Sequence, residues 1–172
     1  MTPWRLVGSE RLSAIRNRFL DFLGKLNPSK VLLLKQYLLQ KDMNEVWTGG
    51  ISSYGLILMV VSFLQQHPRD ERNLGILLIE FFQLYGRQFN YQKCCIRVKN
   101  GGQYIKKDEM LEQMKGDNGA IGKYIPNFLS IEDPLTPSND IGRASHGAEN
   151  VKDAFEHAYR LAGFSTISPN KF

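Results

Sequence analysis

The chain has 172 residues, of which 42% are hydrophobic, 23% charged and 11% aromatic, so it has the composition of one globular domain and not of a disordered chain. Lys and Arg number 22 and Asp and Glu 17, which gives a net charge of +5. A positive excess of this size is compatible with a nucleic acid or nucleotide partner but does not require one.

Membrane, disulfide-stabilised and zinc-binding classes are disfavoured. The longest apolar run, 56–63, is interrupted by Ser62 and is far shorter than the roughly 20 residues of a spanning helix. The first twelve residues contain no apolar signal core. The two cysteines, Cys94 and Cys95, are adjacent, which disfavours a disulfide and indicates a reducing, intracellular compartment. The three histidines do not have the spacing of zinc ligands.

The first half of the chain predicts a series of helices. Apolar residues recur at helical spacing over 9–26, 31–40, 52–66 and 73–85. Ser29 is the expected N-cap of the second helix, and Ser52 or Ser53 that of the third, which is apolar on nearly all sides and should lie in the middle of a bundle. Gly86 is expected to end the fourth helix.

The second half is mixed. Segments 94–98 and 103–105 flank Asn100-Gly101-Gly102 and predict a β-hairpin. A helical turn over 108–114, a glycine-rich loop over 116–122, a short strand over 128–131, a long functional loop over 132–147 and a last helix over 149–162 follow. We therefore expect a mainly α (α+β) fold: a helical bundle with a small hairpin, forming one domain over 1–164 with a frayed tail over 165–172.

One candidate anion site is the segment from Gly49 to Tyr54, where glycines and hydroxyls precede a helix. Backbone N–H groups at a helix N-terminus attract anions, and the Tyr54 ring offers a flat surface for a base. An ordinary glycine turn with a serine cap is the alternative, and spacing alone favours it.

A second candidate is the irregular stretch 131–143, which combines carboxylates, an amide and Arg143. Loops of this length in compact domains often carry function, although Asp133 and Asn139 could simply stabilise turns.

Basic residues give two weaker signals. Lys35 lies within an apolar helix, where a lysine either extends to solvent or faces an anion. The predicted hairpin is basic and could form an RNA-facing patch, although a solvated strand face is the default interpretation. Its basic residues are Lys93, Arg97, Lys99, Lys106 and Lys107.

No catalytic group or metal site is predicted in this chain. The sequence has no P-loop, no pattern typical of a Ser-His-Asp or Cys-His set, and no Asp-x-Asp on a predicted strand that could hold the metal ions of phosphoryl transfer.

Three long segments nevertheless resemble the central domain of non-canonical poly(A) polymerases of the nuclear, exosome-feeding (TRAMP) type. They are KQYLLQKDMNEVWTGGISSY over 35–54, IEFFQLYGRQFNY over 79–91, and IEDPL through NDIGR over 131–143. Their order and spacing also match, and the resemblance covers residues 12–162. The resemblance implies that this chain contains the poly(A)-polymerase-associated segment of an enzyme of the polymerase-β-type nucleotidyltransferase superfamily.

The resemblance also implies roles for individual residues. Lys35 would contact the triphosphate, Ser53 would contact phosphate, and Tyr54 would stack on the base. Asp133 and Asn139 would lie near the base edge, with Arg143 bracing the nucleotide-recognition loop. Related uridylyltransferases tend to have histidine where this chain has Asn139, which favours ATP over UTP.

In that family the complete enzyme adds adenylate from ATP to RNA 3′ ends in RNA surveillance and processing, using Mg²⁺ or Mn²⁺ bound by a separate catalytic domain. The resemblance implies an RNA 3′ end, ATP, a zinc-knuckle RNA-binding protein and an exosome-cofactor RNA helicase as partners, without a membrane. It implies a nuclear location, nucleolar or nucleoplasmic, with the cytoplasm as a further site. We expect this chain alone to be inactive, because the metal-binding aspartates are not in it.

Two alternatives stay open: a non-catalytic module that docks the zinc-knuckle partner, and part of a terminal uridylyltransferase. Two departures from the family pattern concern the sugar and triphosphate contacts. Leu39 stands where a second basic residue is common, and Val7-Gly8-Ser9 stands where an asparagine usually touches the ribose.

Overall fold

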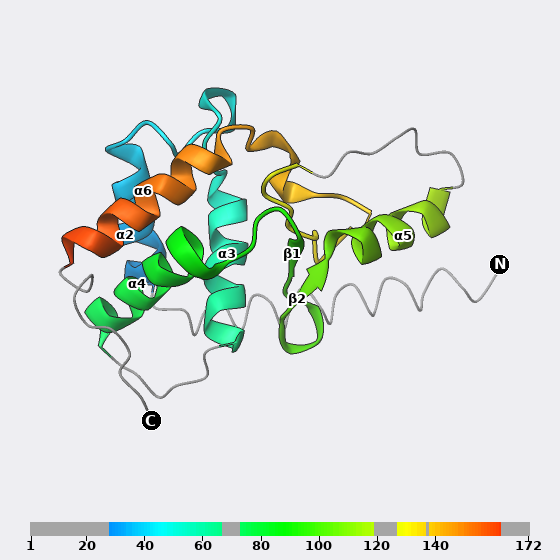
Figure 1. Cartoon of the computed structure of the whole chain (residues 1–172), viewed down its shortest axis with the longest axis horizontal. Coiled ribbons are helices and arrows are strands. Elements are labelled where there is room, and N and C mark those ends of the chain that lie inside the picture. Colours follow the sequence, from blue (N-terminus) through cyan, green and yellow to red (C-terminus); the bar gives the residue numbers. More distant parts are fainter. Residues whose placement is uncertain (1–27, 67–72, 119–126, 137, 163–172) are drawn as a thin grey trace.

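The computed structural model describes residues 28–66, 73–118, 127–136 and 138–162 (Figure 1). The predicted helix over 9–26 and the predicted tail over 165–172 lie outside these residues. The regular elements are α2 (Pro28–Leu39), α3 (Ser53–Gln66), α4 (Leu74–Gln83), β1 (Cys94–Arg97), β2 (Gln103–Lys106), α5 (Lys107–Asn118) and α6 (Ala148–Leu161). The fold is mainly helical with one antiparallel hairpin, as predicted, and no helix in the described ranges is long and apolar enough to cross a membrane.

Helix α3 forms the centre of the molecule, as its apolar sequence predicts. It lies between α2, α4 and α6 on one side and the hairpin with α5 on the other (Figure 1). Leu58 and Met59 are completely buried, and Leu56 and Val61 nearly so. A helix that is apolar on all sides is stable only when other elements cover all its faces, so α3 fixes the positions of the elements around it.

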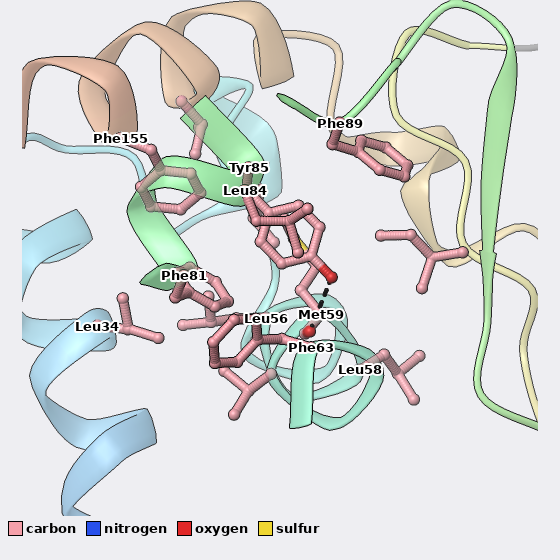
Figure 2. Close-up of a cluster of buried hydrophobic side chains, with 14 of the residues drawn as sticks. Leu34, Leu56, Leu58, Met59, Phe63, Phe81, Leu84, Tyr85, Phe89 and Phe155 are labelled. Carbon is pink, nitrogen blue, oxygen red and sulfur yellow. Dashed lines mark hydrogen bonds between the residues drawn. The ribbon is translucent and has the colours of Figure 1, made fainter. Parts of the chain in front are cut away.

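Aromatic rings connect α3 to the elements beside it (Figure 2). Phe81 of α4 contacts Phe63 and Phe155 edge-on, with ring centroids 5.7 Å and 5.5 Å apart. The buried Tyr85 hydroxyl donates to the Met59 carbonyl at 2.9 Å. These edge-to-face contacts have the geometry that aromatic quadrupoles favour, so they orient α4 and α6 as well as burying area.

The prediction that Gly86 ends the fourth helix is wrong. Helix α4 continues into a π-helical turn, η2 (Leu84–Gln88), in which the Phe89 N–H donates to the Leu84 carbonyl at 2.8 Å. The reason for the glycine is a close approach and not a left-handed cap. A Cβ on Gly86 would lie 2.5 Å from the backbone nitrogen of Glu156 in α6.

Two other element boundaries differ from the predictions. Helix α2 begins at Pro28, so Ser29 lies inside it and is not its N-cap. Proline is favoured in the first turn because its φ is already helical and its missing N–H has no intrahelical partner there. Helix α5 extends to Asn118, into the first part of the predicted glycine-rich loop, and residues 119–122 of that loop lie outside the described residues. The predicted strand over 128–131 contributes only an isolated bridge between Ile131 and Ile96.

Asn73 caps the first turn of α4. Its Oδ1 accepts from the Gly75 and Ile76 N–H groups at 2.9 Å and 3.4 Å. Asn73→Ala should lower the free energy of unfolding by about 1 kcal/mol because this turn loses its side-chain acceptor. Asn73→Ser, which retains an acceptor, should lose less in the same urea titration, and equal losses in the two variants would contradict the capping role.

Candidate functional site

An open groove lies where the start of α3 meets the loop over 131–144. Its volume is about 590 Å³. Residues of both segments line it, together with Val46 of the 3₁₀ turn η1 (Val46–Thr48). The lining residues are Val46, Ser52, Tyr54, Asn139, Asp140, Ile141, Arg143 and Ala144.

Tyr54, Asp133 and Asn139 form a hydrogen-bonded cluster at this groove. The Tyr54 hydroxyl donates to Asp133 Oδ1 at 3.3 Å, and Asn139 Nδ2 donates to Asp133 Oδ2 at 3.1 Å. Asp133 Oδ1 also accepts from the Leu135 N–H at 2.9 Å, so it stabilises a turn as well. Asp133 thus stabilises a turn, which was one of the two interpretations of this residue, and also contacts Tyr54 and Asn139 at the groove.

The Tyr54 phenol is a neutral donor at physiological pH. Burial and the neighbouring Asp133 carboxylate raise the pKa of Tyr54 to about 12. Because the pKa is raised, folding stabilises the protonated phenol. Its contribution to the free energy of unfolding is fully present below the ordinary pKa near 10 and is lost as the pH rises through about 12. The hydrogen bond from Tyr54 to Asp133 is therefore intact across the range in which proteins function.

Asp140, which was not among the predicted site residues, stabilises the loop over 131–144. Its Oδ1 accepts from the Ile131 and Gly142 N–H groups, both at 2.8 Å, and caps the 3₁₀ turn η4 (Ile141–Ala144). The Ile141 N–H donates to the Ile131 carbonyl at 2.9 Å. Aspartate side chains often accept a hydrogen bond from the backbone two residues on in turns, and this turn preference is the signal that could have identified Asp140.

The glycine turn before α3 contacts the N-terminus of α6. Gly49 has a φ of 87°, a left-handed conformation that glycine adopts without strain. Its carbonyl accepts from the Gly147 N–H at 2.9 Å. Ser52 is the N-cap of α3, with its Oγ accepting from the Gly55 N–H at 3.0 Å. The glycine turn and serine cap that the sequence offered as the alternative interpretation are thus present. They lie beside the groove, at the N-terminus of α3.

Of the six predicted site residues, Tyr54, Asn139 and Arg143 line the groove. Asp133 does not line it but hydrogen-bonds to Tyr54 and Asn139. Arg143 is exposed and lines it. Ser53 is exposed at the first position of α3, next to the lining residue Ser52. Lys35 is exposed on α2 and is not among the residues that line the groove.

The basic hairpin is not uniformly solvated. Lys93 and Lys106 are exposed, but Lys107 is buried and donates to the Asn127 and Phe128 carbonyls. Burial lowers the pKa of Lys107. Arg97 pairs with the buried Glu132, so these two cations hold protein groups and the default interpretation of a solvated strand face fails for them.

The described residues do not fit a metal centre. They contain no group of three or more His, Cys, Asp or Glu side chains placed to hold an ion.

A sequence model described as "Cid1 family poly A polymerase" matches residues 73–139. Poly(A) RNA polymerase cid14 of Schizosaccharomyces pombe is 38% identical over 161 residues, which is 90% of this chain and 22% of that protein. A solved polymerase core of TRAMP, an RNA surveillance complex, is 33% identical with a TM-score of 0.70, covering 88% of this chain and 47% of that one. The chain belongs to the non-canonical poly(A) polymerase family.

Other members of the family differ in the activity that their names state. The inactive non-canonical poly(A) RNA polymerase protein Trf4-2 of Drosophila melanogaster is 42% identical over 77% of this chain and 33% of its own length. A solved cytoplasmic RNA terminal U-transferase is 25% identical with a TM-score of 0.68, covering 92% of this chain and 60% of that one. The chain thus spans about a fifth to a third of these curated poly(A) polymerases.

Proposed function

We propose that the groove beside Tyr54 binds the adenine base of ATP in an enzyme that adds adenylate to RNA 3′ ends. One observation carries the proposal. Tyr54 and the loop of Asp133 and Asn139, 79 or more positions apart in sequence, meet in a hydrogen-bonded cluster on an open groove. Family membership supports the class of reaction, and the cluster supports the place of binding.

The groups at the groove suit a purine nucleotide. The Tyr54 ring is partly exposed and is restrained through its hydroxyl, so a base can stack on a surface whose orientation is already set. The Asn139 amide carries both a donor and an acceptor, like the adenine edge.

Phosphate and loop roles are part of the same proposal. Ser53 lies at the N-terminus of α3, where the helix dipole favours anions. Lys35 would contact the triphosphate from α2 only if the nucleotide extends beyond the groove, and Arg143 would brace the loop.

The complete enzyme would combine this domain with a polymerase-β-type catalytic domain that holds Mg²⁺ or Mn²⁺. Similarity to the polymerase core of TRAMP, an RNA surveillance complex, supports a role in RNA surveillance. A nuclear location is part of the same proposal. A zinc-knuckle RNA-binding protein and an exosome-cofactor helicase are the proposed protein partners.

We expect no adenylate transfer by this chain alone. The described residues hold no carboxylate cluster for the metal ions that phosphoryl transfer uses. A purified sample with ATP, Mg²⁺ and a labelled RNA primer should show no extension above a mock preparation, whereas time-dependent extension that copurifies with the chain would contradict this expectation.

A second candidate function is a non-catalytic interaction module, and exposed apolar side chains favour it. The Trp47 side chain is 79% exposed, and Leu32, Leu33 and Leu39 are also exposed. Large exposed apolar groups often mark contact surfaces. The module would bind its protein partner equally well with and without ATP.

Saturation-transfer NMR with ATP tests the main proposal, because it detects the weak binding expected of a domain that lacks its catalytic partner domain. Irradiating the protein should transfer saturation to the adenine H2 and H8 protons more strongly than to the ribose protons, because the base lies against the Tyr54 ring. Excess AMP should compete and UTP should compete less well. Absence of transfer to adenine at millimolar ATP would contradict the proposal and leave the interaction module as the better account.

A further inference from the structure

Arg97 and Glu132 form a buried ion pair between the hairpin and the recognition loop. Arg97 Nε lies 2.6 Å from Glu132 Oε2, and the two side chains are 12% and 4% exposed. Arg97 Nη1 is also 3.9 Å from the Glu109 carboxylate of α5. An arginine this well covered has a fixed position, because its planar guanidinium bonds in a set direction and α5 limits its movement.

Backbone hydrogen bonds connect the same two segments. The Ile96 N–H donates to the Ser130 carbonyl at 3.0 Å, and the Glu132 N–H donates to the Ile96 carbonyl at 2.9 Å. These bonds form a parallel bridge between β1 and the start of the loop. Glu132 is thus held through both its backbone and its side chain.

Neighbouring positions of the loop face different partners. The Glu132 carboxylate contacts Arg97 of the hairpin, whereas the carboxylate of the next residue, Asp133, contacts Tyr54 and Asn139 at the groove. Consecutive side chains of extended backbone point in opposite directions. A displacement of the Glu132 backbone would therefore also move the Asp133 carboxylate that contacts Tyr54 and Asn139.

We propose that Arg97 is a positioning residue for base recognition: it fixes Glu132, and through the adjacent backbone it fixes Asp133 at the groove. The proposal rests on the proposed function, because it takes the groove as the base site. Arg97 does not line the groove, so its effect on the nucleotide passes through the loop.

A purely structural role is the competing explanation. Removing one member of a buried pair leaves the other charge without its partner and destabilises the fold. Arg97→Gln alone therefore cannot separate the two roles. The double variant Arg97→Gln/Glu132→Gln removes both charges and retains groups that can hydrogen-bond, and Arg97→Lys retains the charge without the planar fork.

The experiment measures the dissociation constants of ATP and UTP for this chain by NMR titration. In the double variant we expect the preference for ATP over UTP to fall by roughly threefold to thirtyfold, the range typical of indirect coupling to a site. In Arg97→Lys we expect a smaller fall, of at least about twofold. A general loss of stability would weaken both nucleotides together and leave their ratio unchanged, so the ratio is the readout that a structural role would not move.

Arg160→Gln is the matched control, because it breaks another arginine–glutamate pair, 2.5 Å long but on the exposed side of α6. It should leave the ratio unchanged. Arg97→Lys retains the positive charge opposite Glu132. If this variant keeps the wild-type ratio of the ATP and UTP dissociation constants, the proposal is overturned whether or not the double variant folds.

Failure of this proposal differs from failure of the proposed function. If the wild-type chain shows no saturable ATP shifts at the groove, the base site itself is wrong. If the wild-type chain binds ATP and Tyr54→Ala weakens binding while Arg97→Lys keeps the wild-type ratio, only the positioning role is wrong.

Discussion

Asn139→His should shift the preference of a polymerase carrying this domain from ATP toward UTP by roughly fivefold to 150-fold. The Asn139 amide donates one N–H to Asp133, which fixes its plane and leaves it a donor and an acceptor that can face the groove. The adenine edge offers the complementary pair, whereas uracil presents carbonyl oxygens on both sides of one N–H. A mismatched edge costs about 1–3 kcal/mol when a polar group stays unpaired in a partly buried site.

The alternative is that Asn139 serves only the turn. Its backbone N–H donates to the Thr136 carbonyl at 2.8 Å and its carbonyl accepts from the Asp133 N–H at 3.0 Å. These bonds survive a change of side chain, so a turn role predicts little effect of histidine. The measurement is the ratio of kcat/KM for ATP and UTP, with Thr136→Ala as the control in the same loop. A ratio that does not move toward UTP would return Asn139 to a turn role.

Tyr54→Ala should weaken use of ATP by about 1–3 kcal/mol in the same enzyme, which is the usual contribution of an aromatic side chain stacked on one base. The loss corresponds to roughly fivefold to 150-fold in kcat/KM. The reason is removal of a ring that is held in place at the groove by its bond to Asp133.

Tyr54→Phe is the matched control because it keeps the ring and removes the hydroxyl. If stacking dominates, this variant should retain most of the wild-type efficiency. Equal losses in Tyr54→Phe and Tyr54→Ala would show that the hydroxyl and its contact with Asp133 matter more than the ring. Wild-type kinetics in Tyr54→Ala would return Tyr54 to a packing role.

Local sequence signals predicted the parts of the fold that depend on local physics. Ser52 caps α3, and Asn100, Gly101 and Gly102 all adopt positive φ in the hairpin turn. Each of these residues is favoured by its own conformational or hydrogen-bonding properties, so no knowledge of distant segments was needed. The positions of Tyr54 and Asp133 were predicted only through resemblance to a family, since spacing does not show that segments so far apart meet.

The failures occurred where distant backbone decides the outcome. Gly86 has the sequence signature of a helix end, but the approach of α6 gives it a different role. Arg97 and Lys107 lie in the basic stretch that the sequence predicts as a solvated hairpin, yet both bond to residues more than 20 positions away in sequence, Glu132 and Phe128. The sequence around a charged residue does not show that a distant segment will bury it. Strand periodicity indicates only which face of the sheet the residue lies on, not what covers that face.

The most direct test of the base site is a map of the amide resonances of this chain during titration with ATP. The account predicts saturable shifts that cluster at Tyr54 and over 133–143. In Tyr54→Ala these shifts should disappear together, while the rest of the spectrum remains that of a folded protein. Saturable shifts confined to the exposed lysines of the hairpin, Lys93 and Lys106, with none at Tyr54 or Asn139, would contradict it.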